Sequence, residues 1–359
     1  MENLFNYNWE LCKLEEIVDV RSGRDYKHLG SGNIPVYGTG GYMLSVSEAL
    51  SYDEDAIGIG RKGTINNPYI LKAPFWTVDT LFYTVPKNNF DLNFIYSIFR
   101  KTNWKSKDES TGVPSLSKTT INAVTVYIPS GSEQQRIGKF FKQLDDTITL
   151  HQRKLDQLKE LKKAYLQLMF PVKDERVPKL RFADFEEEWE QCKLEDLANK
   201  YNNLRIPITA SKRIYGNTPY YGANGIQDFV EGYTHDGEFI LVAEDGASNL
   251  KDYPVQYVNG KVWVNNHAHV LQAKRSKADN KFLMNAIKSI NIEPFLVGGG
   301  RSKLNSEVMM NLEINTPSKD EQLKISTLCK QLDDITALYQ NKLNQLKNLK
   351  KSYLQNMFI

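Results

Sequence analysis

Apolar residues recur every three or four positions along two long segments, residues 133–170 and 321–358. The recurring positions include Leu144, Leu155, Leu158 and Tyr165 in the first segment, and Leu332, Leu343, Leu346 and Tyr353 in the second. No proline interrupts either segment, and the only glycine is Gly138. Each segment therefore predicts one long helix, and spacing near 3.5 residues predicts that the two helices pair with each other as a coiled coil. We expect this pair to be antiparallel.

The two segments belong to an internal repeat. Residues 317–358 match residues 129–170 at 25 of 42 positions, including the shared run Lys-Gln-Leu-Asp-Asp. Trp-Glu-x-Cys-Lys-Leu-Glu occurs at 9–15 and again at 189–195, and the Pro-Val-Tyr-Gly of 35–38 returns as Pro-Tyr-Tyr-Gly at 219–222. The chain is thus two copies of one unit, a body followed by a helix, and we expect a pseudo-twofold arrangement with one body at each end of the helix pair.

The bodies combine short strand patterns with short helix patterns. Runs at 56–59, 81–85, 239–243 and 269–271 predict strands, and runs at 92–99 and 282–287 predict helices. The predicted fold class is mixed α/β. The predicted domains are a first body at 1–132, a first helix at 133–170, a linker at 171–184, a second body at 185–320 and a second helix at 321–358.

Composition narrows the class of protein. No apolar run approaches the roughly 18 residues of a membrane span, and the first residues lack the cationic and apolar stretches of a signal peptide. We therefore expect a cytoplasmic protein. Three scattered cysteines are too few for a disulfide framework or a Cys-based metal site, and buried packing is their expected role.

Two motifs suggest chemistry that the surrounding sequence does not support. Residues 58–63 form a Gly-x-Gly-x-x-Gly pattern, but Asn66-Asn67-Pro68 follows where a cofactor-binding helix should begin, and the repeat has Leu241, Ala243 and Gly246 at the glycine positions. His267 and His269 share one face of a strand without a third metal ligand. We predict that this chain holds no cofactor and no metal.

One enzymatic alternative stays open. Residues 36–40 followed by Asn67-Pro68-Tyr69 faintly resemble the cofactor loop and catalytic tetrapeptide of adenine-N6 methyltransferases, although the second proline of that tetrapeptide is missing. A stand-alone adenine-N6 DNA methyltransferase is therefore the alternative function. A pure coiled-coil scaffold is a further possibility, which the diverged bodies disfavour.

The charge distribution places basicity on the helices. The net charge is +3 for the chain, −1 for the first body, −3 for the second body, +1 for the linker and +3 for the helical stretches 133–170 and 321–358 each. Because phosphate attraction supplies most non-specific DNA affinity, bodies that bind DNA must concentrate their cations locally. Local clusters occur at 21–27, 61–62, 205–213 and 298–303.

The motifs, taken in order and repeated, resemble the specificity subunit of type I restriction-modification systems over essentially the whole chain. They are the repeated opening heptapeptide, residues 35–42 and 219–225, the Ile-Gly-Arg-Lys-Gly-Thr loop at 59–64, the Pro-Ser-x-x-Glu-Gln pair at 129–134 and 317–322, and Pro-Lys-Leu-Arg-Phe at 178–182. The first copy departs from this pattern because it lacks the Pro-Lys-Leu-Arg-Phe lead-in.

The resemblance implies that each body is a target-recognition domain that reads one half of a bipartite double-stranded DNA site. The helices would set the spacer, since about 35 residues span roughly 50 Å, and would dock two methyltransferase subunits. The subunit would be non-catalytic: its partners would use S-adenosylmethionine, and added restriction subunits would use ATP and Mg²⁺. The predicted DNA-contacting residues are Tyr37, Thr39, Arg61, Lys62 and Lys118 in the first body, and Tyr221, Asn224, Arg301 and Lys303 in the second.

Overall fold

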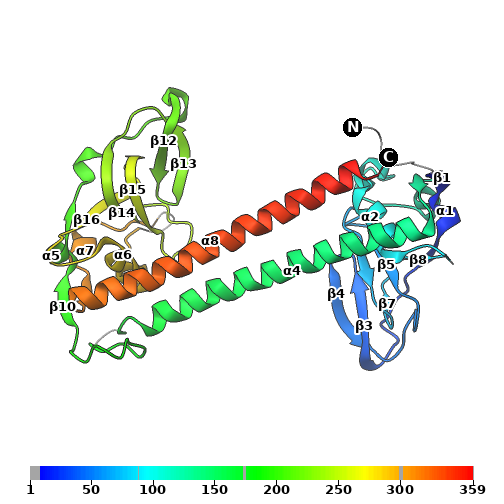
Figure 1. The fold of residues 1–359 in the computed structure, drawn as a ribbon, viewed down its shortest axis with the longest axis horizontal. Helices are drawn as coiled ribbons and strands as arrows, with labels where there is room; N and C mark the ends of the chain where they lie inside the picture. Colours follow the sequence, from blue (N-terminus) through cyan, green and yellow to red (C-terminus); the bar gives the residue numbers. More distant parts are fainter. Residues whose placement is uncertain (1–8, 88, 173–174, 299–301, 359) are drawn as a thin grey trace. The chain divides into compact units, whose positions relative to one another are not determined.

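The structure is a computed structural model that describes residues 9–87, 89–172, 175–298 and 302–358. The chain forms two compact units, one of residues 1–153 with 340–359 and one of residues 154–339. Both long helices, α4 (Gly131–Leu168) and α8 (Lys319–Asn356), contribute to both units (Figure 1). The predicted mixed α/β class is confirmed. The predicted domain boundaries stay a prediction, because the units group each body with parts of both helices.

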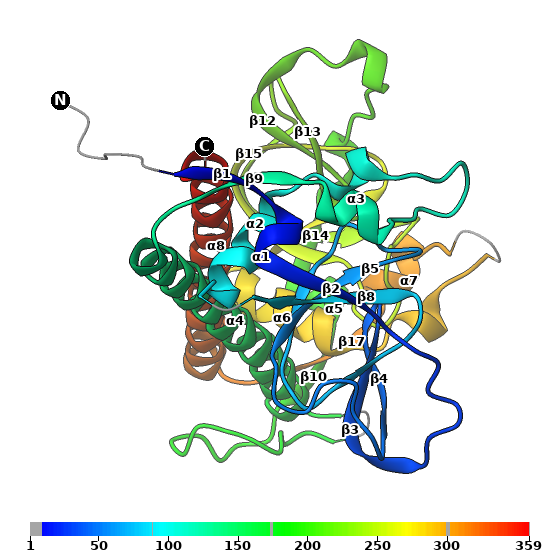
Figure 2. The same cartoon turned by 90° about the vertical axis from the view of Figure 1, so that its right-hand side faces the viewer.

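The first unit contains three small sheets. Strand β1 (Glu10–Lys13) pairs with β9 (Thr125–Ile128), and two further sheets have the orders β2-β8-β5-β6 and β4-β3-β7. Their bounds are β2 (Val18–Ser22), β3 (Ser31–Gly38), β4 (Gly41–Val46), β5 (Ala56–Gly60), β6 (Tyr69–Leu71), β7 (Trp76–Thr77) and β8 (Leu81–Pro86). Figure 2 shows β3 and β4 as a long hairpin that extends away from β2, β5 and β8.

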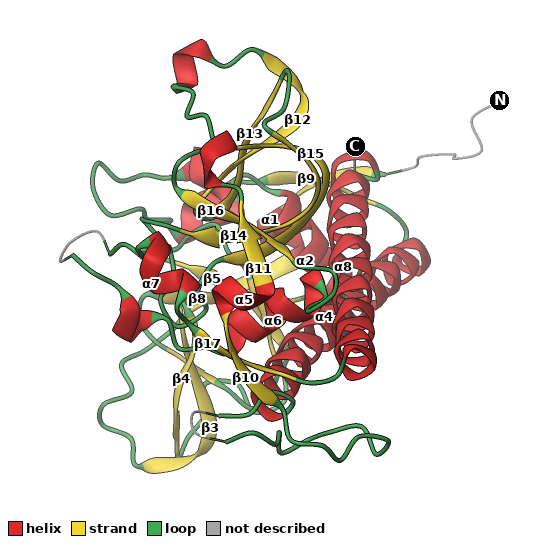
Figure 3. Cartoon of the chain, turned by 90° about the vertical axis from the view of Figure 1, so that its left-hand side faces the viewer, coloured by secondary structure: helices red, strands yellow, loops and turns green. Residues whose placement is uncertain are grey.

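The second unit repeats this topology in a larger sheet. Strand β10 (Glu190–Lys193) pairs with β17 (Glu313–Thr316), and six strands follow the order β11-β16-β14-β15-β12-β13 in a strongly curved sheet (Figure 3). Their bounds are β11 (Ala198–Lys200), β12 (Tyr215–Gly222), β13 (Gly225–Val230), β14 (His235–Ala243), β15 (Val255–Val264) and β16 (Ala268–Ala273).

One long strand in the second unit replaces two short strands in the first. Strand β7 pairs in parallel with β3 through Trp76, and β15 pairs in parallel with β12 through Trp263, so the two tryptophans are equivalent. Between β6 and β7 lies Pro74, which has no N–H for a strand ladder, whereas β15 contains no proline. The uninterrupted β15 therefore joins two sheets into one.

Short helices pack against these sheets. They are α1 (Leu14–Ile17), α2 (Leu92–Lys101) and α3 (Lys118–Asn122) in the first unit, and α5 (Leu194–Leu197), α6 (Asn280–Ser289) and α7 (Ser306–Met310) in the second. Single 3-10 turns lie at η1 (Trp104–Lys107), η2 (Asn202–Leu204), η3 (Ala210–Lys212) and η4 (Glu293–Phe295). All the short runs predicted from periodicity lie within β5, β8, β14, β16, α2 and α6.

Each core is closed by a phenylalanine that follows a long helix. In the first unit the ring centroid of Phe358 lies 6.1 Å from that of Trp9 and 5.7 Å from that of Phe94. In the second unit Phe170 lies 6.0 Å from Trp189 and 5.6 Å from Phe282. The repeated Trp-Glu-x-Cys motif therefore supplies the indole against which the end of a helix packs.

Within each unit the two helices run antiparallel. In the first unit Phe140 of α4 contacts Tyr353 of α8, and Asp145 is ion-paired with Lys350. In the second unit Lys162 of α4 is ion-paired with Asp333 of α8. Over the described residues, no helix is both long and apolar enough to span a membrane.

The cysteines are free, but only Cys329 is fully buried. Cys12 and Cys192 are half-buried, so the expectation of buried packing is wrong for these two. They lie in β1 and β10 and pack against the two cores, which buries them only in part.

Candidate nucleic-acid interface

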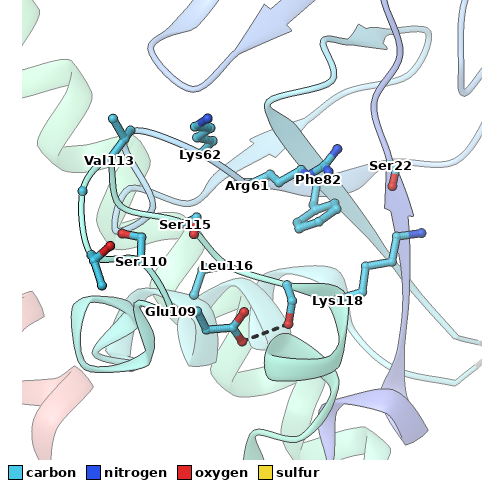
Figure 4. Close-up of a pocket in the computed structure, with 13 residues that line it drawn as sticks. Ser22, Arg61, Lys62, Phe82, Glu109, Ser110, Val113, Ser115, Leu116 and Lys118 are labelled. Carbon is cyan, nitrogen blue, oxygen red and sulfur yellow. Dashed lines mark hydrogen bonds between the residues drawn. The ribbon is translucent and has the colours of Figure 1, made fainter.

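Two loops of the first body meet around a pocket of about 820 Å³, which Ser22 of β2 and Phe82 of β8 also line (Figure 4). Arg61 and Lys62 follow β5, and the segment 109–118 closes over them, since Gly63 N–H donates to Pro114 O at 2.8 Å and Leu116 N–H donates to Arg61 O at 2.9 Å. Thr39, in the β3–β4 turn, lies beside the same loop: a Cβ on Gly63 would be 3.9 Å from its hydroxyl. Four of the five predicted residues, Thr39, Arg61, Lys62 and Lys118, therefore lie in or beside one site.

The cationic side chains of this pocket are exposed, but the backbone segments that carry them are fixed by hydrogen bonds. Arg61 N–H donates to Thr80 O at 2.8 Å, and its guanidinium donates to Asp79 O at 3.4 Å and lies 5.7 Å from the centre of the Phe82 ring. Lys118 is the first residue of α3, whose N-cap Ser117 accepts from Thr120 N–H. In Figure 4, Arg61 and Lys118 extend toward Ser22, while Lys62 lies nearer Val113.

The remaining lining suits a polyanion with hydrogen-bonding groups. The hydroxyls of Ser110, Thr111 and Ser115 line the wall, and Gly112 leaves it without a side chain. Glu109 also lines the pocket, but its carboxylate accepts from Ser117 Oγ at 2.9 Å. Arginine and lysine among hydroxyl groups can contact phosphate oxygens or the acceptors of guanine, so the site is chemically suited to DNA.

The two predicted tyrosines are mainly packing residues in this structure. Tyr37 in β3 is half-buried, with its ring centroid 6.4 Å from that of Tyr42 and 6.0 Å from that of Tyr69. Tyr221, its equivalent in β12, packs against the core of the curved sheet, and burial raises the pKa of its hydroxyl. Their contact with DNA stays a prediction.

In the second body the equivalent loops also meet, but their polar groups are occupied. Asn224, in the β12–β13 turn, donates to Gly246 O at 2.9 Å and accepts from Ser248 N–H at 2.7 Å. Lys303 lies 3.0 Å from the carboxylate of Glu244. Arg301, the remaining prediction, lies outside the described residues. Asn224 thus joins the two loops, and Lys303 has an acidic partner.

Two arginines of the 205–213 cluster are committed to internal bonds. Arg205 binds Glu244 at 2.6 Å and Ala268 O at 2.8 Å, and Arg213 binds Asp228 and stacks 4.3 Å from the centre of the Tyr220 ring. Sequence reasoning missed Glu244 as the partner of Arg205. The signal was present, because the repeat aligns Glu244 and Asp245 with Arg61 and Lys62.

The two histidines of the His267-Ala268-His269 motif make hydrogen bonds. His269 is buried and binds Asn202 and Leu304 O, and His267 binds Asp245 at 2.6 Å. In the described part of the chain, no three His, Cys, Asp or Glu side chains are grouped so as to hold a metal ion.

The helix residues predicted to pair with the other helix or to dock partners differ in how deeply they are buried. Leu144, Leu155, Leu158, Leu332 and Leu343 are buried, and Tyr165 and Leu346 are half-buried. Tyr353 is 37% exposed and its ring centroid lies 5.1 Å from that of Phe140. Burial suits packing within the protein better than partner docking.

The exposed apolar positions of the helices are different residues. Leu150 is 63% exposed and its equivalent Leu338 is 66% exposed, while Leu161 and its equivalent Leu349 are each 44% exposed. The repeat offset of 188 residues, which places a leucine at 150 and again at 338, was the signal that could have found the first pair.

Comparison with known proteins identifies the family. Residues 6–160 and 186–348 each match the type I restriction modification DNA specificity domain. The chain belongs to this family. A type I restriction enzyme specificity subunit of Haemophilus influenzae is 46% identical over 153 residues, which are 43% of this chain and 38% of that protein. The MjaVIII specificity subunit of Methanocaldococcus jannaschii is 20% identical over 74% of this chain and 68% of its own length.

A solved structure shares the fold of this specificity-domain protein. The S subunit of a type I restriction-modification system from M. genitalium has a TM-score of 0.77 at 14% identity, over 100% of this chain and 98% of that chain. The whole fold, with both bodies and both helices, is therefore that of a known S subunit.

Proposed function

We propose that this protein is the sequence-specific DNA-binding subunit of a type I restriction-modification complex, in which each body reads one half of a bipartite target. The observation that carries the proposal is the repeated loop site. One chain holds two bodies of equivalent topology, and in each the turn of the β3–β4 or β12–β13 hairpin meets the loop after β5 or β14. The two bodies share their strand topology but differ in their loop side chains, as expected for two domains that recognise different DNA sequences.

In this proposal the long helices set the distance between the two half-sites and dock the partner subunits. Each is 38 residues long, or about 57 Å. Leu150 and Leu338 occupy equivalent exposed positions, which suits two copies of one methyltransferase subunit. Docked subunits would also add cations around DNA, which the near-neutral and acidic bodies lack.

The proposed subunit contributes specificity and no chemistry. S-adenosylmethionine would be bound by the methyltransferase partners, and ATP and Mg²⁺ by restriction subunits. The alternative, a stand-alone adenine methyltransferase, required Tyr69 at a catalytic position. The hydroxyl of Tyr69 instead donates to Gly38 O at 2.6 Å and its ring packs on Tyr37, which disfavours that alternative.

Exchange of one body tests the proposal. Replacing residues 1–132 with the body of another family member, in the complex with the methyltransferase of this system, is expected to change one half of the methylated sequence and leave the other half intact. The reciprocal exchange of residues 185–320 is the matched control and is expected to change the opposite half. Changes in both halves, or in neither, would contradict the proposal. Methyl transfer by the purified chain alone would instead establish the enzymatic alternative.

A further inference from the structure

The two bodies carry opposite charges at one equivalent backbone position. Arg61 follows β5 and Glu244 follows β14; their N–H groups donate to Thr80 O and His267 O, each at 2.8 Å. Their carbonyls accept from Leu116 and Leu304 N–H at 2.9 and 2.7 Å. The next residues are likewise paired, Lys62 with Ser115 and Asp245 with Lys303. The first body thus has two cations where the second has two acids.

Glu244 is the centre of a compact charged cluster. Its carboxylate lies 2.6 Å from Arg205 Nη1, 3.0 Å from Lys303 Nζ and 3.4 Å from His269 Nδ1. The side chain of Glu244 is 13% exposed and that of Arg205 is 14% exposed, but that of Lys303 is 46% exposed. A single, largely buried carboxylate therefore joins one largely buried cation to one that reaches the surface.

His269 adds no charge to the cluster. Its Nε2 lies 2.8 Å from Leu304 O, which can only accept, so Nε2 carries the proton. Nδ1 then accepts from the amide of Asn202 at 2.9 Å. Burial lowers the pKa of His269, in agreement with a neutral ring.

The backbone beside Lys303 is fixed from three directions. Leu304 N–H donates to Glu244 O, and Leu304 O accepts from His269. Lys303 itself exchanges both backbone hydrogen bonds with Val297, at 2.8 and 2.9 Å. Only the side chain of Lys303 therefore remains free to rotate, and its ammonium group is paired with Glu244.

We propose that Glu244 is a positioning residue, whose carboxylate, anchored by Arg205, holds the Lys303 ammonium where it contacts a phosphate of the second half-site. The inference rests on the proposed function. In the first body Arg61 and Lys62 supply positive charge directly at the equivalent position. In the second body the cation is Lys303 of the neighbouring loop, and Glu244, at the position of Arg61, orients its side chain.

The dependence of DNA affinity on salt separates positioning from simple charge neutralisation. The complete complex is measured with a duplex that carries its mapped target and with a scrambled duplex. Loss of one phosphate contact is expected to reduce the slope of log affinity against log salt by about 0.9. K303Q is expected to show this loss with both duplexes, with roughly three- to tenfold weaker binding at low salt, and K303R is expected to retain the slope.

E244Q is the deciding variant, because the two accounts predict opposite signs. If Glu244 only neutralises charge, its loss strengthens binding and steepens the slope. If it positions Lys303, E244Q lowers the slope as K303Q does, although the protein has become more positive, and E244Q/K303Q is no weaker than K303Q. The control E190Q makes the same charge change on β10, away from these loops, and is expected to leave the slope unchanged.

Several results would overturn the inference. They are a wild-type slope in K303Q, a steeper slope in E244Q, or additive losses in the double variant. Should E244Q fail to fold, E244D retains the carboxylate and must retain the slope; its loss in folded E244D contradicts the inference. Failure of the proposed function is distinguishable, since the wild-type complex would then not discriminate target from scrambled DNA.

Discussion

Arg61 is the residue that we propose reads a base in the first half-site. It is exposed, its backbone is fixed by Thr80 and Leu116, and its guanidinium lies against Phe82. We expect R61A to cost about 1–3 kcal/mol in binding and to relax one position of the first half-site, measured by affinity for duplexes substituted at single positions.

The control for this prediction is K72A. Lys72 follows β6, beside the first residue of β5 and therefore at the opposite end of β5 from Arg61, and it is ion-paired with Asp55. Its loss is expected to leave specificity unchanged. Equal weakening of R61A on all sequences would contradict base reading and assign Arg61 to a phosphate.

The second body should lose stability in mild acid because of two buried histidines. Burial lowers the pKa of His269 and of His235 below their ordinary value of 6.5. The neutral forms therefore stabilise the fold fully above pH 6.5, and this contribution decreases as the pH falls below 6.5 toward the folded-state pKa. The loss is about 1.4 kcal/mol per pH unit for each histidine.

H269Q tests this account, since glutamine keeps a donor for Leu304 O but does not titrate. Thermal unfolding between pH 7 and 5.5 is expected to show about half of the wild-type acid destabilisation, with His235 responsible for the rest. H28Q, at an exposed site in the first body, is the control. An unchanged acid dependence in H269Q would show that His269 is not protonated on unfolding.

Sequence alone predicted which loops come together at the candidate site better than it predicted the contacts of each side chain. Exposed cations after a strand, such as Arg61 and Lys62, are visible as a motif. The engagement of Asn224 with Gly246 and of Lys303 with Glu244 depends on loops distant in the chain, and no local pattern shows it. Tyr37 could not be assigned for the same reason, because its neighbour Tyr69 comes from another sheet.

At the scale of elements, the long helices followed from periodicity, but their exposed face did not. Leu161 and Leu349 obey the repeat of three and four and yet remain 44% exposed, because a two-helix pair covers only a narrow seam of each helix. Periodicity finds the apolar positions; the partner's position decides which of them are buried.

The exposed leucines predict two equivalent docking sites. L150D and L338D are each expected to reduce the methyltransferase content of the purified complex from two copies to one, and the double variant to none, measured by native mass spectrometry. The cause is a carboxylate buried against an apolar surface. Q157D and Q345D introduce the same charge at exposed, equivalent positions and should retain both copies. Full occupancy in the double leucine variant would place docking elsewhere.

For the strands, the sequence predicted the individual elements but not how they associate into sheets. Single buried strands such as β5 and β14 were predicted from short apolar runs. The sequence did not predict that the sheets β2-β8-β5-β6 and β4-β3-β7 stay separate in the first body while their equivalents form one curved sheet in the second, because this depends on whether a strand continues past the position of Pro74.

At the scale of the whole molecule, the internal repeat was the most informative feature of the sequence. It predicted two bodies and two long helices, and the match of both bodies to one specificity domain confirms the family. The bases read by each body could not be predicted, because loop geometry and DNA deformation determine them.

If one chain holds two DNA readers joined by helices of fixed length, its target must be a split sequence with a fixed gap. The most direct test is to co-express the protein with the methyltransferase subunit of its own system and to map methyladenine across the host genome. We expect one asymmetric motif in two halves, separated by a gap of constant length. Methylation of a continuous motif, or no methylation by an intact complex that binds S-adenosylmethionine, would contradict it.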